Sequence, residues 1–180
     1  TVLNGTSLEV TYLTTGAAQR VQVASMVADS LADCGVRVNV QYLDQAALYA
    51  PGPDGPLFGR NFDLVQFAMG NTGVEPSCAW FTGAEVPDTA NDWVGTNTSG
   101  YANPGFDAAC LAVRQSLPDE AAYGQGYQEM QALFAQDLPV VPLYWRIKVA
   151  AARPGLLHFA LDPTALSSLW NIEAYELPLP

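Results

Sequence analysis

The sequence predicts an α/β fold, because strand, helix and strand patterns follow one another near its start. Apolar residues alternate with polar or smaller ones from 8 to 12, which is the period of a strand. Val23, Val27 and Leu31 recur every fourth residue, so an amphipathic helix is expected from residue 17 to about 33. A second alternation, from 36 to 42, completes a βαβ unit. Its strands should be parallel and joined by a right-handed crossover.

A short helix and a loop are expected after this unit. Gly35, between the helix and the second strand, suits a left-handed helix cap. Asp44 is expected to cap a short helix that runs through Tyr49. Residues 51–56 are rich in proline and glycine and indicate a loop.

A third strand is expected in the middle of the chain. Residues 62–68 are apolar on both alternating faces apart from Asp63 and Gln66, which favours a central strand buried on both sides. Residues 70–100 are rich in Gly, Asn, Thr and Pro and indicate a long loop. Loops of this length inside compact domains are usually functional.

Two helices are expected in the C-terminal half. Asn103 and Pro104 start the first, which ends near residue 117, and Pro118 starts the second, which stops at Pro139. Gly124 and Gly126 weaken the second helix by about 1 kcal/mol each relative to Ala, and we expect them to mark close packing. Its apolar face consists of Tyr123, Tyr127, Met130 and Phe134.

Further strands are expected after the second helix. The apolar runs 140–144 and 147–152 predict two of them, and residues 169–175 alternate like a third.

Composition and charge argue against several classes of function. The chain has 180 residues, enough for one good core or two small ones, and it is 49% hydrophobic and 14% charged, so it should fold. No apolar run approaches the roughly 20 residues of a membrane span, and no targeting signal is visible at the start. A net charge of −11 repels phosphate backbones, so no nucleic-acid partner is expected. His158 is the single histidine, and no metal or cofactor is expected.

The three cysteines lack the CxxC spacing of zinc and iron–sulfur sites. Cys34 lies on the apolar face of the predicted helix, which indicates a buried free thiol. Cys78 and Cys110 lie in or beside polar segments, and we predict that they form a disulfide. Such a bridge indicates an oxidising compartment. The alternative is three free thiols in a cytosolic protein.

No residue pattern predicts catalysis. The sequence has no G-x-S-x-G elbow, and no pair of acids is obviously placed on a buried strand end. A binding loop is expected instead at Met69–Thr72, since a polar, glycine-containing loop after a strand is where α/β folds bind ligands. Trp145 follows a predicted strand and can stack on a ligand. A plain turn and a core or rim tryptophan are the structural alternatives.

Seven short segments resemble segments of a known family, and they follow one another in the same order and at similar spacings as in that family. The segments are 8–12 (LEVTY), 31–36 (LADCGV), 62–64 (FDL), 75–76 (EP), 100–107 (GYANPGFD), 137–143 (DLPVVPL) and 169–173 (LWNIE). The family is the extracellular solute-binding proteins of family five, the peptide and oligopeptide receptors of ABC importers. The resemblance implies an α/β, type II periplasmic-binding-protein-like lobe, with a mixed, mainly parallel sheet flanked by helices.

The resemblance also implies how the chain is organised. Family members are several hundred residues longer and hold their ligand between two lobes. Residues 1–145 would be the C-terminal lobe, and residues 146–180 a return segment that packs toward the N-terminal lobe. The protein would be exported, to the extracellular face of the membrane or to the periplasm, and would act as a monomer with a membrane permease as partner.

The resemblance places the ligand site and modifies the expected ligand. The site would be formed by the segment around Gln45 and Tyr49, by Met69, Gly70, Asn71 and Thr72, and by Trp145. In peptide-binding relatives, an aspartate before Glu-Pro pairs with the peptide amino group, and this place falls on Thr72. The tryptophan that relatives carry after the second strand falls near Gln45. Both differences favour an uncharged or hydroxylated solute, such as an oligosaccharide, as an alternative to a peptide.

The function expected is therefore that of a non-enzymatic substrate-binding component of an ABC importer. Two alternatives stay open. One is an exported hydrolase that uses paired carboxylates, and the other is a receptor lobe that passes a solute signal to a membrane partner without transport.

Overall fold

The computed structural model describes residues 8–70, 77–145, 147–162, 165 and 167–178. The chain forms two compact units. Unit 1 consists of Thr1–Ala68 and Cys78–Val140, and unit 2 consists of Met69–Ser77 and Val141–Pro180. The chain therefore crosses between the units three times. The expected division of a longer protein at residue 145 stays a prediction.

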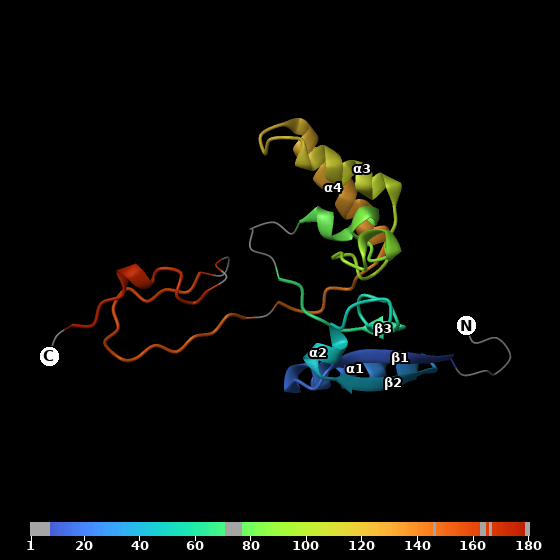
Figure 1. Cartoon of the computed structure of the whole chain (residues 1–180), viewed down its shortest axis with the longest axis horizontal. Helices are drawn as coiled ribbons and strands as arrows, with labels where there is room; N and C mark the ends of the chain where they lie inside the picture. Colours follow the sequence, from blue (N-terminus) through green and yellow to red (C-terminus); the bar gives the residue numbers. More distant parts are fainter. Residues whose placement is uncertain (1–7, 71–76, 146, 163–164, 166, 179–180) are drawn as a thin grey trace. The chain divides into compact units, whose positions relative to one another are not determined.

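The predicted βαβ unit is confirmed in unit 1 (Figure 1). Strand β1 (Leu8–Thr15) and strand β2 (Val36–Leu43) are parallel along their whole length and are joined by helix α1 (Ala18–Asp33). Gly35 has φ +80°, the left-handed conformation that glycine adopts without strain.

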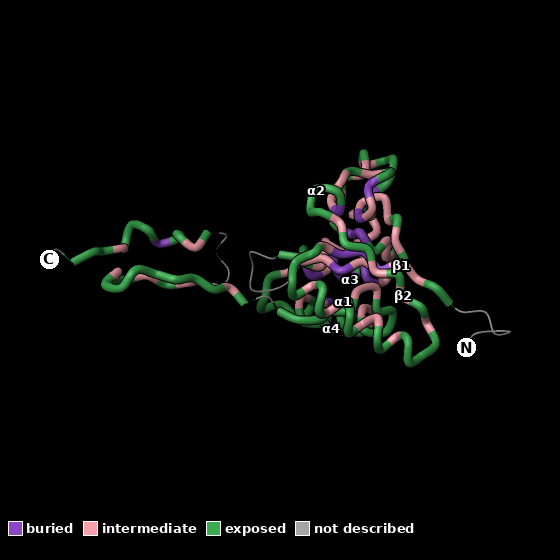
Figure 2. The backbone as a smooth tube through the Cα atoms, turned by 90° about the horizontal axis from the view of Figure 1, so that it is seen from below, coloured by how far each residue is buried: buried purple, intermediate pink, exposed green. Residues whose placement is uncertain are grey.

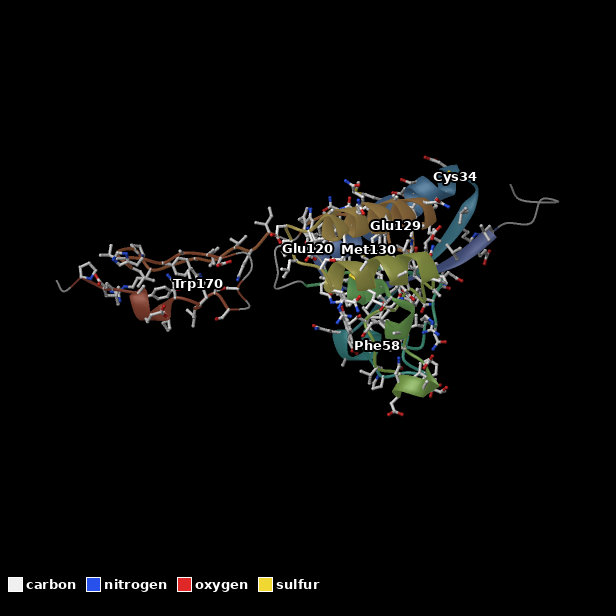
Figure 3. The ribbon with its side chains drawn as sticks, turned by 90° about the horizontal axis from the view of Figure 1, so that it is seen from above. Cys34, Phe58, Glu120, Glu129, Met130 and Trp170 are labelled. Atoms are coloured by element: carbon white, nitrogen blue, oxygen red, sulfur yellow. A yellow bond between two sulfur atoms is a disulfide. The ribbon has the colours of Figure 1, made fainter. Side chains whose placement is uncertain are left out.

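Cys34 contradicts the expected buried thiol. It is the residue that caps the C-terminus of α1, and its side chain is exposed (Figure 3). Helix α1 ends at Asp33, so Cys34 follows the helix and does not lie on its apolar face. Cys34 is the free cysteine of this chain.

The third strand differs from its prediction. Strand β3 contains only Leu64–Val65 and pairs in parallel with Tyr12 and Leu13. The strand order is β2-β1-β3, so β1 is central and β3 lies at an edge of the described sheet. All described pairings in the sheet are parallel. Leu64 is 37% exposed, because an edge strand of two residues is not covered on both sides.

The two faces of the sheet differ. Ala24 of α1 is fully buried, and α1 packs along β1 and β2. The other face of β2 carries the exposed polar residues Arg37, Asn39 and Gln41. Arg37 Nη1 lies 2.8 Å from Glu9 Oε1 on this face. We call it the polar face of the sheet.

A helical hairpin forms the second core of unit 1. Helix α3 (Pro104–Arg114) packs against helix α4 (Ala121–Asp137) (Figure 1). Asn103 caps α3 by accepting hydrogen bonds from the backbone N–H groups of Gly105 (2.9 Å) and Phe106 (3.2 Å). The buried residues between the helices are Phe106, Ala109, Cys110, Val113 and Met130.

The packing of α4 confirms one glycine prediction and contradicts another. Gly126 is buried, and a Cβ there would lie 2.6 Å from Cγ2 of Val113 and 3.0 Å from the carbonyl oxygen of Ala109. A Cβ at Gly124 would meet nothing within 4 Å, so this glycine does not mark close packing. Helix α4 begins at Ala121, later than Pro118, because Glu120 Oε2 accepts a hydrogen bond from the N–H of Leu117 (3.0 Å) and closes a turn first.

The segment 77–100 contains no strand, as predicted, but it is tightly organised. It forms three 3₁₀ turns, at Cys78–Phe81, Gly83–Glu85 and Thr89–Asn91. Asn97 is fully buried and joins the first two of these turns to the residues before α3. Its Nδ2 donates to the carbonyl oxygens of Thr82 (2.9 Å) and Tyr101 (2.7 Å), and its Oδ1 accepts from the Ser99 hydroxyl (2.8 Å). Asn97 begins a glycosylation tripeptide, but these contacts make it inaccessible in the folded chain.

Unit 2 contradicts the three C-terminal strand predictions. The described residues form no strand at 140–144, 147–152 or 169–175, and a 3₁₀ turn, Ile172–Ala174, lies within the last of these ranges. The β-pairing described in unit 2 is an isolated antiparallel bridge between Leu157 and Glu176. A strand needs a neighbour for its backbone groups, and the runs after α4 have none among the described residues. Figure 2 shows unit 2 almost entirely as exposed or intermediate. None of the helices that the structure describes is long and apolar enough to cross a membrane.

Candidate functional site

Gln45 and Tyr49 are brought together by helix α2 (Gln45–Leu48), which follows the carboxyl end of β2. The Asp44 side chain starts this helix by accepting a hydrogen bond from the N–H of Ala47 (2.7 Å), as predicted. The N–H of Tyr49 donates to the carbonyl oxygen of Gln45 (3.1 Å). Leu48 is fully buried and fixes the helix to the core, so the exposed Gln45 amide stands on a rigid base.

Gln66 is a buried anchor, although in the sequence it stands out only as a polar residue within an apolar run. It is 6% exposed, and its N–H donates to the carbonyl oxygen of Leu13 (2.8 Å). Its Oε1 accepts from the hydroxyl groups of Tyr12 (3.2 Å) and Thr14 (3.3 Å). A buried amide satisfied in this way fixes the end of its strand. The signal for it is that Gln66, like Asp63, is polar within an otherwise apolar run.

Met69 and Gly70 follow this anchor and belong to unit 2. Both are exposed, and a Cβ at Gly70 would meet nothing within 4 Å. The backbone at Gly70 is thus open to approach in the described chain. Asn71 and Thr72, the other two residues of the predicted loop, lie outside the described residues.

Trp145 also belongs to unit 2 and is 90% exposed. This exposure contradicts the alternative of a core tryptophan. Apolar neighbours at alternate positions are exposed as well, including Val141 at 63% and Ile147 at 86%. The residues of the predicted ligand site are thus divided between unit 1, with Gln45 and Tyr49, and unit 2, with Met69, Gly70 and Trp145.

Two further anchors stand where the chain crosses between the units. Cys78, the first residue of unit 1 after the loop, forms the predicted disulfide with Cys110 (Cα–Cα 5.7 Å). Cys110 is 1% exposed in the core of the α3–α4 hairpin (Figure 3 shows its neighbour Met130 on α4). Asp137, at the end of α4, accepts hydrogen bonds through Oδ2 from Tyr101 and Asn103, both at 2.8 Å.

The described residues offer neutral binding groups rather than a metal centre. They contain no group of three or more His, Cys, Asp or Glu side chains that could hold a metal ion. Gln45 provides an amide, Tyr49 a phenol and Trp145 an indole. Such groups can hydrogen-bond to a solute or stack on it.

The chain is similar to a protein of known sequence and to proteins of known structure. No model of a known protein family matches it. An uncharacterized lipoprotein of Mycobacterium tuberculosis is 26% identical over 151 residues, which are 84% of this chain and 26% of the relative. The oligopeptide-binding protein of Thermus thermophilus, solved with a pentapeptide, superposes with a TM-score of 0.72 at 21% identity, over 87% of this chain and 28% of that one.

Two other solved proteins have the same fold. The oligopeptide-binding protein AppA of Bacillus subtilis, in complex with a nonapeptide, superposes with a TM-score of 0.70 at 19% identity over 99% of this chain. NikZ of Campylobacter jejuni, in complex with Ni(L-His), gives a TM-score of 0.56 at 17% identity. The chain spans between 26% and 35% of the length of these proteins and of the M. tuberculosis lipoprotein. It has the α/β fold of part of a periplasmic oligopeptide-binding protein.

Proposed function

We propose that this chain is the C-terminal lobe of a solute-binding protein that captures a small extracellular solute for an ABC importer. The single observation that carries this proposal is the match over 87% of the chain to an oligopeptide-binding protein solved with a pentapeptide. A fold alone does not define a function, so the proposal also rests on the seven sequence segments that resemble the family.

The ligand would bind to the neutral and aromatic groups that the chain exposes. Gln45 and Tyr49 of α2 would form one part of the site, and Met69, Gly70, Asn71 and Thr72 a second part. Trp145 would stack on the solute. The second lobe would complete the site, and closure of the two lobes would follow from a higher affinity for the solute in the closed state.

The solute is proposed to be a peptide, with an oligosaccharide as the alternative. The peptide reading is supported by the two relatives that were solved with peptides. The oligosaccharide reading is supported by Thr72, which lacks the charge that would pair with a peptide amino group, and by the neutral Gln45.

Residues 146–180 are proposed to be a return segment that packs toward the N-terminal lobe. Its exposed apolar residues support this, because Ile147 and Val149 are 86% and 81% exposed and would be covered by such packing. Trp145, at the start of the segment, would then lie near the solute.

The proposed compartment is the extracellular face of the membrane or the periplasm, with a permease as partner. The disulfide between Cys78 and Cys110 supports export, because such bonds persist in oxidising compartments. The similarity to an M. tuberculosis lipoprotein supports it as well. We propose a monomeric, non-enzymatic protein. A hydrolase of the paired-carboxylate type would need two carboxylates at one recess, and the recess that the described residues form on the polar face of the sheet is lined by one, Asp63.

The proposal is tested by identifying the solute that the protein carries. The protein would be purified from its own cells in its longest natural form, and the small molecules released on denaturation would be identified by mass spectrometry. We expect peptides or oligosaccharides in near-stoichiometric amount. Release of no solute, together with no thermal stabilisation by peptide and oligosaccharide panels, would contradict the proposal.

Matched variants locate the site. Gln45→Ala and Trp145→Ala should each lower the amount of retained solute severalfold. Gln22→Ala, at an exposed position of α1, and Trp170→Ala, at a half-exposed tryptophan of unit 2, are the controls. Equal loss in the controls would place the site elsewhere.

A further inference from the structure

We propose that a recess on the polar face of the sheet binds small organic cations, namely an amine attached to a compact apolar group. The recess has a volume of about 480 Å³, within the range of roughly 300–1,000 Å³ that is usual for small-molecule sites. Three parts of unit 1 form it: β1, β2 and the loop before β3. Its lining residues are Thr11, Leu13, Gln41, Leu43, Pro56, Asn61, Phe62 and Asp63.

The walls of the recess are fixed by hydrogen bonds within the chain. Asp63 Oδ2 accepts a hydrogen bond from the N–H of Thr11 (2.7 Å), which joins the loop to β1. The Asn61 side chain donates to the carbonyl oxygen of Pro53 (2.9 Å), and its N–H donates to that of Pro56 (2.9 Å). A recess held in one shape by its own contacts costs a ligand little ordering entropy.

The charge of the recess selects a cation. Asp63 is the one ionisable residue among the lining residues. Arg37, a basic residue on the same face of β2, is paired with Glu9 at 2.8 Å. Arg60, next to Asn61 in sequence, donates to the carbonyl oxygen of Pro87. Among the described residues, the second carboxylate oxygen of Asp63 has no hydrogen-bond donor, so it can accept from an ammonium group. The Asp63 carboxylate would repel an anion there.

The rest of the lining selects an apolar body. Leu13 is 4% exposed and forms the floor, and Leu43 and Phe62 are half-buried. The Phe62 ring adds a face on which a cation is attracted. Gln41 and Thr11 provide neutral hydrogen-bonding groups beside the carboxylate.

Among the described residues, this site shares none with the one proposed for the transported solute. None of Gln45, Tyr49, Met69, Gly70 and Trp145 lines the recess. The inference does not rest on the proposed function, and either can fail without the other.

The test is a titration of the ¹⁵N-labelled 180-residue chain, followed by NMR, with three ligands of one shape. Benzylamine carries a positive charge, benzyl alcohol is neutral and benzoate is negative at pH 7. We expect saturable shifts at the amides of Thr11, Gln41 and Phe62 with benzylamine, about three- to fivefold weaker binding of benzyl alcohol, and no saturation with benzoate. The absence of saturable shifts, or binding of benzoate as tight as that of benzylamine, would overturn the proposal.

Two charge-removing variants separate the recess from the general negative charge of the chain. Asp63→Asn keeps an oxygen that can accept from the Thr11 N–H and removes the charge. Its affinity for benzylamine should fall to that for benzyl alcohol. Asp29→Asn removes the same charge from an exposed position of α1, outside the recess, and should leave the affinity unchanged. If both variants weaken binding equally, the interaction is non-specific and the site is rejected.

Discussion

The hydroxyl of Tyr101 donates a hydrogen bond of 2.8 Å to Oδ2 of Asp137, across 36 positions of sequence. The contact joins the segment before α3 to the last residue of α4. Partial burial of the phenol, together with this carboxylate, raises the pKa of Tyr101 from 10.0 to about 12. The protonated phenol is therefore favoured in the folded state.

This pKa shift predicts a pH dependence of stability. In the unfolded chain Tyr101 releases its proton near pH 10, whereas in the folded chain the phenol stays protonated up to about pH 12. The stabilising contribution is therefore complete below pH 10 and is lost between pH 10 and about 12. Tyr101→Phe should cost about 1 kcal/mol at pH 8, and the difference from the unaltered chain should narrow as the pH rises above 10. Urea unfolding at pH 8, 10 and 11 measures this. A constant difference would contradict the assignment.

Asn97 is predicted to be the most sensitive polar position of unit 1. Asn97→Ala removes the partners of the Thr82 and Tyr101 carbonyl groups and of the Ser99 hydroxyl. We expect a loss of about 3 kcal/mol in the free energy of unfolding, because buried polar groups are left without partners. Asn39→Ala, at an exposed position of β2, is the control and should change it by less than about 0.5 kcal/mol. If Asn97→Ala lowers the free energy of unfolding by less than Asn39→Ala does, the hydrogen bonds of Asn97 do not stabilise unit 1.

The two glycines of α4 should respond oppositely to alanine. Gly126→Ala forces a methyl group against Cγ2 of Val113 and the carbonyl oxygen of Ala109 and should cost about 1–3 kcal/mol. Gly124→Ala, where nothing lies within 4 Å, should gain up to about 1 kcal/mol from helix propensity. Chemical denaturation of the two variants measures the difference. If both substitutions change the free energy of unfolding in the same direction, α3 and α4 are not packed this closely.

The disulfide is predicted to be a large contributor to stability. The double variant Cys78→Ser, Cys110→Ser should have a free energy of unfolding about 3.5–4 kcal/mol lower. This is the loss expected when a bridge between residues 32 positions apart is removed. Cys34→Ser is the control and should have little effect, because Cys34 is exposed and free. Thiol titration of the denatured, unreduced chain should find one thiol, the three cysteines less the two in the bridge. Three thiols would rule out the bridge.

The sequence was sufficient where structure depends on local pattern. The βαβ unit, the Asp44 cap and the start of α3 at Pro104 each follow from residue period or capping chemistry within a few positions. The disulfide was also predicted. These features need no knowledge of distant parts of the chain.

Predictions failed where structure depends on distant neighbours. The apolar run around Leu64 reads as a central strand, but β1 occupies the centre of the sheet. The runs after α4 have strand composition, but a strand forms only beside another strand, and Val141 and Ile147 are exposed instead. The Gln66 anchor was missed because a single glutamine does not reveal which hydroxyl groups will surround it.

The three crossings between units 1 and 2 have a consequence for protein engineering. Residues 69–77 belong to unit 2, yet both of their neighbours along the chain, Ala68 and Cys78, belong to unit 1. A truncation after Val140 would therefore not yield unit 1 alone, because it would leave a nine-residue insert separated from the rest of its unit. A self-standing unit 1 requires two edits, removal of 141–180 and a short linker in place of 69–77. Recombination at a single junction cannot exchange the two units between homologous proteins.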